Sequence, residues 1–214
     1  MRKKTLTIAI ALVLVVALAV GATYAYLTAT TNTLTNTFTV GKTMEDPKSN
    51  FILKEHKVAY DPAVGVYKYV DASGSYVDAA AAEEVADNTY DSVAPGMVVA
   101  KDPFVRIQAP VETPSYLFVE VYGDTTGLQY ALADGWQPVQ LTKAAPNGGT
   151  VYAYQTTLAG SGAVNTYPIL KGDQVTVDRM TALSADASLK FSAYLCQSTG
   201  FGGAAAAFDA CFGK

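Results

Sequence analysis

The sequence is poor in histidine, tryptophan and charge. Its 214 residues include one histidine and one tryptophan, and only 16% are charged. Because His56 is the only histidine, the chain cannot supply the two histidines of an HExxH zinc site. No GxSxG nucleophile motif occurs, and the lysines flanking His56 indicate a solvated strand rather than a catalytic base. We therefore expect no enzyme, with no catalytic residue, metal site or cofactor.

Basic residues are also few, and after residue 4 none of them cluster in the sequence. Lysine and arginine total 15 against 19 acidic residues, for a net charge of −4. Three of the bases are Arg2, Lys3 and Lys4, and the rest of the chain carries a net charge of −7. A mildly acidic surface without a basic run is unsuited to nucleic acid or to an anionic membrane. We expect neither as a partner.

Only one apolar run is long enough to matter for targeting. Residues 5–20 are apolar except for two threonines, and they follow the basic residues 2–4. Small residues come next, which is the pattern of a secretory signal peptide over residues 1–25. The alternative is an uncleaved anchor over residues 5–27. Both readings place the rest of the chain outside the cytoplasm, with membrane contact only through this segment. The expected cleavage region is Thr23, Ala25 and Tyr26.

Residues 26–41, here called the arm, show a strict strand pattern. Threonine occupies every odd position from 31 to 39, so in a strand these side chains share one face. The other face carries Leu34, Asn36, Phe38 and Val40. Such an arm is suited to strand donation, in which Leu34, Phe38 and Val40 fill pockets of a neighbouring subunit. The alternative is that the arm is the first strand of its own domain.

Residues 42–214 predict a single all-β domain. About eight to ten short alternating segments follow one another between turn signals, with no βαβ rhythm. We expect an antiparallel β-sandwich of jelly-roll type, preceded by a signal helix and followed by a short helical C-terminal tail. The main expected elements are a strand over 51–59, a hairpin over 64–77, a helix or loop over 78–86, a type II turn over 94–97, a central strand over 116–122, a strand over 189–196 and a helix over 204–212.

The chain has two cysteines, Cys196 and Cys211. In an oxidising compartment they are expected to pair and to tie the tail to the preceding strand. The alternative is two separate buried thiols, which behave as small apolar side chains. No CxxC spacing is present, so the pair is interpreted as structural rather than redox-active.

Three stretches together resemble a known family. They are residues 21–28 leading to 36–41; residues 93–97, 101–105 and 114–119; and residues 191–197 followed by 200–201 and 206–208. This pattern is similar to the TasA/camelysin family of Gram-positive bacteria, whose signal peptides are processed by the peptidase SipW. The resemblance implies a secreted jelly-roll protein of the biofilm matrix or cell surface. It also implies fibres formed by donation of the N-terminal strand to the next subunit.

The resulting hypothesis is a secreted, non-enzymatic subunit of extracellular fibres. Its implied partners are further copies of itself in a head-to-tail homopolymer, a signal peptidase of SipW type, and an accessory fibre protein. The main alternative is a monomeric cell-surface adhesin or carbohydrate-binding module of the same fold. A secreted hydrolase is a third alternative, which the residues do little to support.

Overall fold

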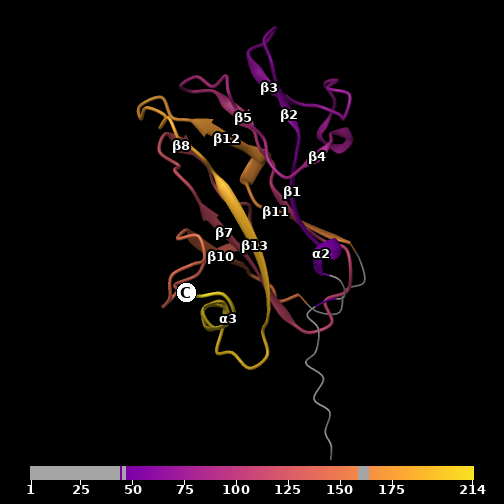
Figure 1. Cartoon of the computed structure of the whole chain (residues 1–214), viewed down its shortest axis with the longest axis vertical. Helices are drawn as coiled ribbons and strands as arrows, with labels where there is room; N and C mark the ends of the chain where they lie inside the picture. Colours follow the sequence, from indigo (N-terminus) through magenta and orange to yellow (C-terminus); the bar gives the residue numbers. More distant parts are fainter. Residues whose placement is uncertain (1–43, 45–46, 159–163) are drawn as a thin grey trace, which may run out of the picture. The chain divides into compact units, whose positions relative to one another are not determined.

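The computed structural model describes residue 44 and residues 47–158 and 164–214 (Figure 1). The chain divides into two compact units, Met1–Val40 and Gly41–Lys214, and the described residues all belong to the second. The predicted signal peptide and the arm therefore lie outside the described residues, as do Thr23, Ala25, Tyr26, Leu34, Phe38 and Val40. Within the described ranges, no helix has the length and apolar character to cross a membrane.

The described residues form an all-β fold, as predicted, and every strand pairing is antiparallel. The first sheet has the order β11 (Asn165–Pro168), β6 (Phe104–Ile107), β1 (Phe51–His56), β4 (Glu84–Val85). The second sheet has the order β13 (Lys190–Gln197), β7 (Ser115–Tyr122), β10 (Thr150–Tyr154), β9 (Trp136–Pro138).

Smaller elements complete the described part of the chain. A three-stranded sheet has the order β5 (Val98–Ala100), β12 (Gln174–Val177), β8 (Leu128–Gln129), and β2 (Val58–Asp61) pairs with β3 (Val66–Tyr69). The helices are α2 (Pro47–Asn50) and α3 (Ala204–Cys211), with short 3-10 turns at Ala79–Ala81 and Lys171–Asp173.

Strand β7 is the central strand that the sequence predicts. Residues 116–122 carry apolar side chains on both faces of the strand, which is typical of a strand buried on both faces. On one face, Leu117 and Val119 join the main core with Ile107 of β6. On the other face, Phe118 packs with Phe208 of α3 in a second core. Because its two faces enter different cores, β7 links these cores. Burial of each such side chain contributes about 1.5–3 kcal/mol.

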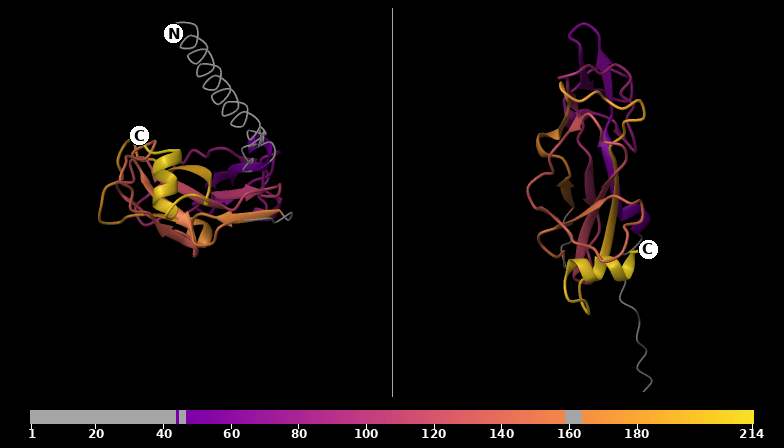
Figure 2. Two further views of the ribbon diagram at one scale, coloured as in Figure 1. Left: turned by 90° about the horizontal axis from the view of Figure 1, so that it is seen from below. Right: turned by 90° about the vertical axis from the view of Figure 1, so that its left-hand side faces the viewer.

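The C-terminal helix α3 also agrees with its prediction. A run of four alanines favours a helix here, and Phe208 is its fully buried contact with the second core. The Asp209 carboxylate accepts hydrogen bonds from the backbone N–H and hydroxyl of Thr142 at 2.8 and 2.6 Å. A disulfide joins Cys211 to Cys196 of β13. These contacts fix α3 across one end of β13 (Figure 2).

A proline–glycine turn precedes β5, as expected. The Met97 N–H donates to the Ala94 carbonyl at 3.0 Å, and Gly96 has a φ of 83°. That φ is the value that a type II turn requires at its third position. The type II turn prediction is therefore confirmed. The turn leads directly into β5, which pairs with β12.

Two strand predictions agree with the structure only in part. The expected strand over 51–59 is interrupted at Lys57, whose N–H donates to the Glu83 carbonyl at 2.7 Å, so β1 and β2 enter different sheets. The expected hairpin over 64–77 is present as a short one. Val70 forms an antiparallel bridge with Tyr76, the Asp71 N–H donates to the Ser75 carbonyl at 3.0 Å, and the Val77 N–H donates to the Tyr69 carbonyl at 3.0 Å. The main partner of β3 is β2, through a turn in which Gly65 has a φ of 71°. Local alternation predicted the strands and the turn over 71–74, but not the break at Lys57 or the pairing of β3 with β2.

Candidate functional site: an open edge between two sheets

The two four-stranded sheets are joined along the side where β9 and β11 lie. The indole N–H of Trp136 donates to the Pro168 carbonyl at 2.8 Å, and the Ala133 N–H donates to the Ile169 carbonyl at 2.8 Å. The rings of Tyr154 and Tyr167 meet edge to face with centroids 4.9 Å apart. These contacts cross from one sheet to the other, so this side of the core is closed.

The other side is bordered by β1 and β13. Among the described residues, β13 has a strand partner on one side only, which is β7 along all eight of its residues. Residues 51–54 of β1 likewise pair only with β6 within the described ranges. Each strand therefore presents a row of backbone donors and acceptors that another strand can pair with. Natural edge strands are usually short or charged, and β13 is neither beyond Lys190.

Apolar side chains between these two edges are incompletely covered. The β13 residues that point to the main core are only partly buried, whereas Leu117 and Val119 of the adjacent β7 are fully buried. Phe51 and Leu53 of β1 are also partly buried against the same core. Phe191, Ala193 and Leu195 share this face of β13, with Leu189 immediately before the strand, as the alternation predicts. The core is thus complete at β9 and β11 but open between β1 and β13.

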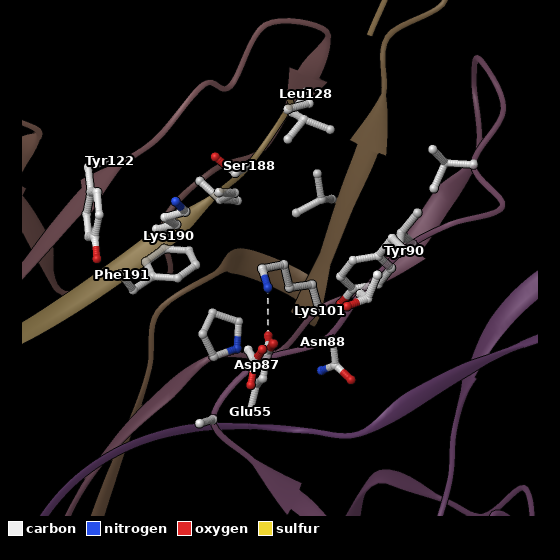
Figure 3. A pocket seen from close by; sticks show the side chains of 18 of the residues that line it. Glu55, Asp87, Asn88, Tyr90, Lys101, Tyr122, Leu128, Ser188, Lys190 and Phe191 are labelled. Carbon is white, nitrogen blue, oxygen red and sulfur yellow. Dashed lines mark hydrogen bonds and ion pairs between the residues drawn. The ribbon is translucent and has the colours of Figure 1, made fainter. Parts of the chain in front are cut away.

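A cavity of about 580 Å³ opens between the second half of β1 and the start of β13 (Figure 3). Its lining includes Leu53 and Glu55 of β1. Lys190 and Phe191 of β13 also line it, and Figure 3 labels both of them together with Glu55. The floor is apolar, with buried valines from β5 and β12, namely Val99, Val175 and Val177. We call this cavity, together with the partly covered apolar side chains of β1 and β13, the edge cleft.

One buried ion pair lies within the edge cleft, whose lining also includes Lys54, Asp87, Asn88 and Lys190. The Lys101 ammonium donates to the Glu55 carboxylate at 2.7 Å, and the two side chains are only 11% and 5% exposed. The Lys101 Nζ atom also lies 5.5 Å from the centre of the Tyr90 ring and 6.0 Å from that of Phe191. Both distances are within cation–π range, so the aromatic rings supplement the carboxylate as partners of the cation. Figure 3 shows the pair facing the cavity.

Tyr90 keeps its proton in this environment. Its hydroxyl donates to the Ala100 carbonyl at 3.0 Å. Burial raises the pKa of Tyr90 strongly, and the negative charges of Glu55 and Asp102 raise this pKa further. The Tyr90 phenol is therefore a neutral neighbour of the Glu55–Lys101 pair.

His56 lies beside this site and is not the solvated residue that its sequence context predicts. Its ring Nδ1 is 2.6 Å from the Asp102 carboxylate, and its backbone N–H donates to the same carboxylate at 2.9 Å. The ring packs against Phe104 and Tyr69, and the side chain is 19% exposed. Asp102 therefore holds both the backbone and the ring of His56 at the junction of β1 with the loop before β6.

The sequence-predicted residues and the edge cleft are largely separate. Cys196 and Cys211 form a disulfide at the α3 end of β13. No local sequence motif links Glu55, Lys101 and Tyr90, because Glu55 and Lys101 are 46 residues apart. Across the described ranges, no three histidine, cysteine or carboxylate side chains lie together as a metal-ion site would require.

Comparisons with family models, with curated proteins and with solved structures found no match to this chain.

Proposed function

We propose that this chain is a secreted structural subunit that forms extracellular fibres by donating its arm to the next subunit. The observation that carries the proposal is the edge cleft, where two strand edges flank an incompletely covered core. A donated strand would pair with an edge through backbone hydrogen bonds and cover the exposed apolar side chains. The jelly-roll topology and the kinship with TasA and camelysin are part of this proposal.

The dimensions of the arm suit the edge. At about 3.3 Å per residue, the seven residues 34–40 span roughly 23 Å, and the eight residues of β13 span roughly 26 Å. Burial of Leu34, Phe38 and Val40 would contribute about 5–9 kcal/mol before the cost of ordering the arm. That energy is enough to hold a subunit contact if the side chains reach the partly covered core.

Donation from each copy to the next gives a filament. A head-to-tail contact does not close on itself unless the rotation returns to the start, so it propagates. Removal of the signal peptide near Ala25 by a peptidase of SipW type would free the arm, and an accessory fibre protein would provide the first acceptor. This assigns the fibre to the extracellular matrix or cell surface of a Gram-positive bacterium.

Two neighbouring arm residues test the proposal. Phe38→Glu places a carboxylate on the face that enters the edge cleft, while Thr37→Glu places the same group on the threonine face. Because burying an unpaired charge is costly, we expect Phe38→Glu to abolish fibres and Thr37→Glu to retain them. Negative-stain electron microscopy and sedimentation of the secreted chains provide the readout.

Equal fibre yield from the two variants would contradict strand donation. A chain that is monomeric in every variant, including the unsubstituted one, would instead favour the adhesin alternative. A glycan array would then be the next experiment.

A further inference from the structure

The backbone of β13 alternates between a side bonded to β7 and a side directed away from it. All eight residues of β13 lie opposite residues of β7 in one unbroken antiparallel register. The same register continues beyond both ends of the strand. There the Ser188 N–H donates to the Asp124 carbonyl and the Ser198 N–H to the Pro114 carbonyl, each at 2.7 Å. Because opposed residues that exchange hydrogen bonds recur at every second position, the even-numbered residues of β13 bond to β7.

The odd-numbered residues of β13 therefore direct their N–H and C=O groups to the open edge. Within the described ranges, no strand pairs with β13 on this side. Three of these residues, Phe191, Ala193 and Leu195, also turn their side chains to the main core, where they are only partly buried. An added antiparallel strand would supply both hydrogen-bond partners and apolar cover, since opposed residues place their side chains on the same face.

The edge of β1 offers a shorter surface of the same kind. The Gln108 N–H donates to the Asn50 carbonyl at 2.9 Å, in register with the pairing of β1 and β6, so the even-numbered residues of β1 bond to β6. The odd-numbered residues point the other way, but from Glu55 onward that side pairs with β4. In the described part of the chain this leaves Phe51 and Leu53 on β1, against residues 191, 193, 195 and 197 on β13.

The two faces of β13 also match the two faces of the arm. Opposite the core-facing residues, β13 carries Lys190, Ser192 and Tyr194, and the Tyr194 hydroxyl donates to the Glu120 carboxylate at 2.7 Å. The arm carries threonines at every odd position from 31 to 39 on one face and apolar residues on the other. A strand that places its apolar face on the main core puts its threonines beside these polar side chains. Cross-strand pairs of polar residues stabilise a sheet.

We infer that the edge of β13, rather than that of β1, accepts the arm of a second copy, through the backbone groups of Phe191, Ala193 and Leu195. This inference rests on the proposed function, because it names the surface of one subunit that receives the arm of the next.

Proline substitutions in the full secreted chain test the assigned edge. Ala193→Pro removes an N–H that points to the open edge and places a ring there, while the hydrogen bonds to β7 remain. We expect this variant to fold, as near-ultraviolet circular dichroism reports, and to raise the critical concentration for assembly at least about tenfold. Light scattering measures that concentration. Ser192→Pro, which removes an N–H bonded to β7, should instead destabilise the fold.

The matched control makes the same backbone change on the other edge. Leu53→Pro removes an N–H on the open side of β1, and Leu53→Ala removes the side chain alone. Because the inference assigns no strand contact to this edge, the critical concentrations of these two variants should agree within about threefold.

Hydrogen exchange tests the same edge without any substitution. Unassembled chain and fibres are exposed to D₂O, dissolved in dimethyl sulfoxide, and read by NMR at single amides. In the unassembled chain, the amides of Phe191, Ala193 and Leu195 should exchange at least about tenfold faster than those of Ser192 and Tyr194. In fibres this difference should disappear. This measurement decides the matter if Ala193→Pro does not fold.

Normal assembly of a folded Ala193→Pro chain, or new protection at Leu53 in place of the β13 amides, would overturn the inference and leave the proposed function standing. Slow exchange at the odd-numbered β13 amides before assembly would mean that the edge is already occupied within one chain, which also overturns the inference. An unsubstituted chain that does not assemble, or assembly that survives deletion of the arm, would overturn the proposed function and the inference with it.

Discussion

At the scale of single residues, a buried carboxylate with several hydrogen-bond donors lies in the middle of the central strand. Glu120 of β7 is fully buried, yet its carboxylate accepts from the backbone N–H groups of Asn147 and Gly149 at 2.9 and 3.0 Å. The Tyr194 hydroxyl donates to it at 2.7 Å. These hydrogen bonds tie β7, the turn before β10 and β13 together. The site lies on the opposite face of β7 from the main core.

Removal of one donor should weaken this network. Tyr194→Phe deletes the hydroxyl and keeps the ring contacts with Phe208 and Phe212. We expect the free energy of unfolding to fall by about 1–2 kcal/mol, because a buried carboxylate loses a hydrogen bond. Urea denaturation measures this change. Tyr116→Phe, whose hydroxyl is not among the donors to Glu120, is the control and should change little.

The same network makes stability depend on pH. Burial by itself would raise the pKa of Glu120, but the hydrogen bonds from Tyr194, Gly149 and Asn147 outweigh it and hold the pKa below the ordinary value of 4.5. A lowered pKa means that the folded state favours the ionised carboxyl. Its contribution is therefore complete above pH 4.5 and is lost as pH falls from 4.5 through the folded pKa.

Glu120→Gln should accordingly flatten the acid side of the stability profile. Urea denaturation between neutral pH and acid would show the unsubstituted chain losing its advantage over Glu120→Gln below pH 4.5. A constant difference between the two chains across that range would show that Glu120 does not change its ionisation on unfolding.

At the scale of elements, local patterns predicted what each segment is but not what it pairs with. β7 was predicted because its apolar residues occupy both faces, and α3 because alanines precede Phe208. The break at Lys57 depends on a hydrogen bond to Glu83, 26 residues away. No pattern within residues 51–59 contains that information, so one strand was predicted where two occur.

The link between β13 and α3 gives an element-scale prediction. The disulfide of Cys196 and Cys211 closes a 15-residue loop, so replacing both by alanine should lower the free energy of unfolding by about 3 kcal/mol. The helix should remain docked through Phe208 and the Thr142 contacts of Asp209. Urea denaturation and far-ultraviolet circular dichroism would check both points. Unchanged stability, or loss of the fold, would contradict this account of α3.

At the scale of the whole molecule, the described unit has a core that is closed on one side and open on the other. Contacts between β9 and β11 close it, whereas β1 and β13 border the edge cleft without pairing to each other. The sequence indicated a strand-like arm with an apolar face, but not where an acceptor would lie. Glu55 and Lys101 meet only through the packing of distant segments, so the polar centre of the cleft has no sequence signal.

The central claim is that the arm drives assembly. Negative-stain electron microscopy with light scattering, applied to a chain beginning at Tyr26 beside one beginning at Gly41, tests it most directly. The account predicts filaments from the first chain and folded monomers with an open edge from the second. Filaments from both chains would place the contact on another surface, and monomers from both would contradict self-assembly.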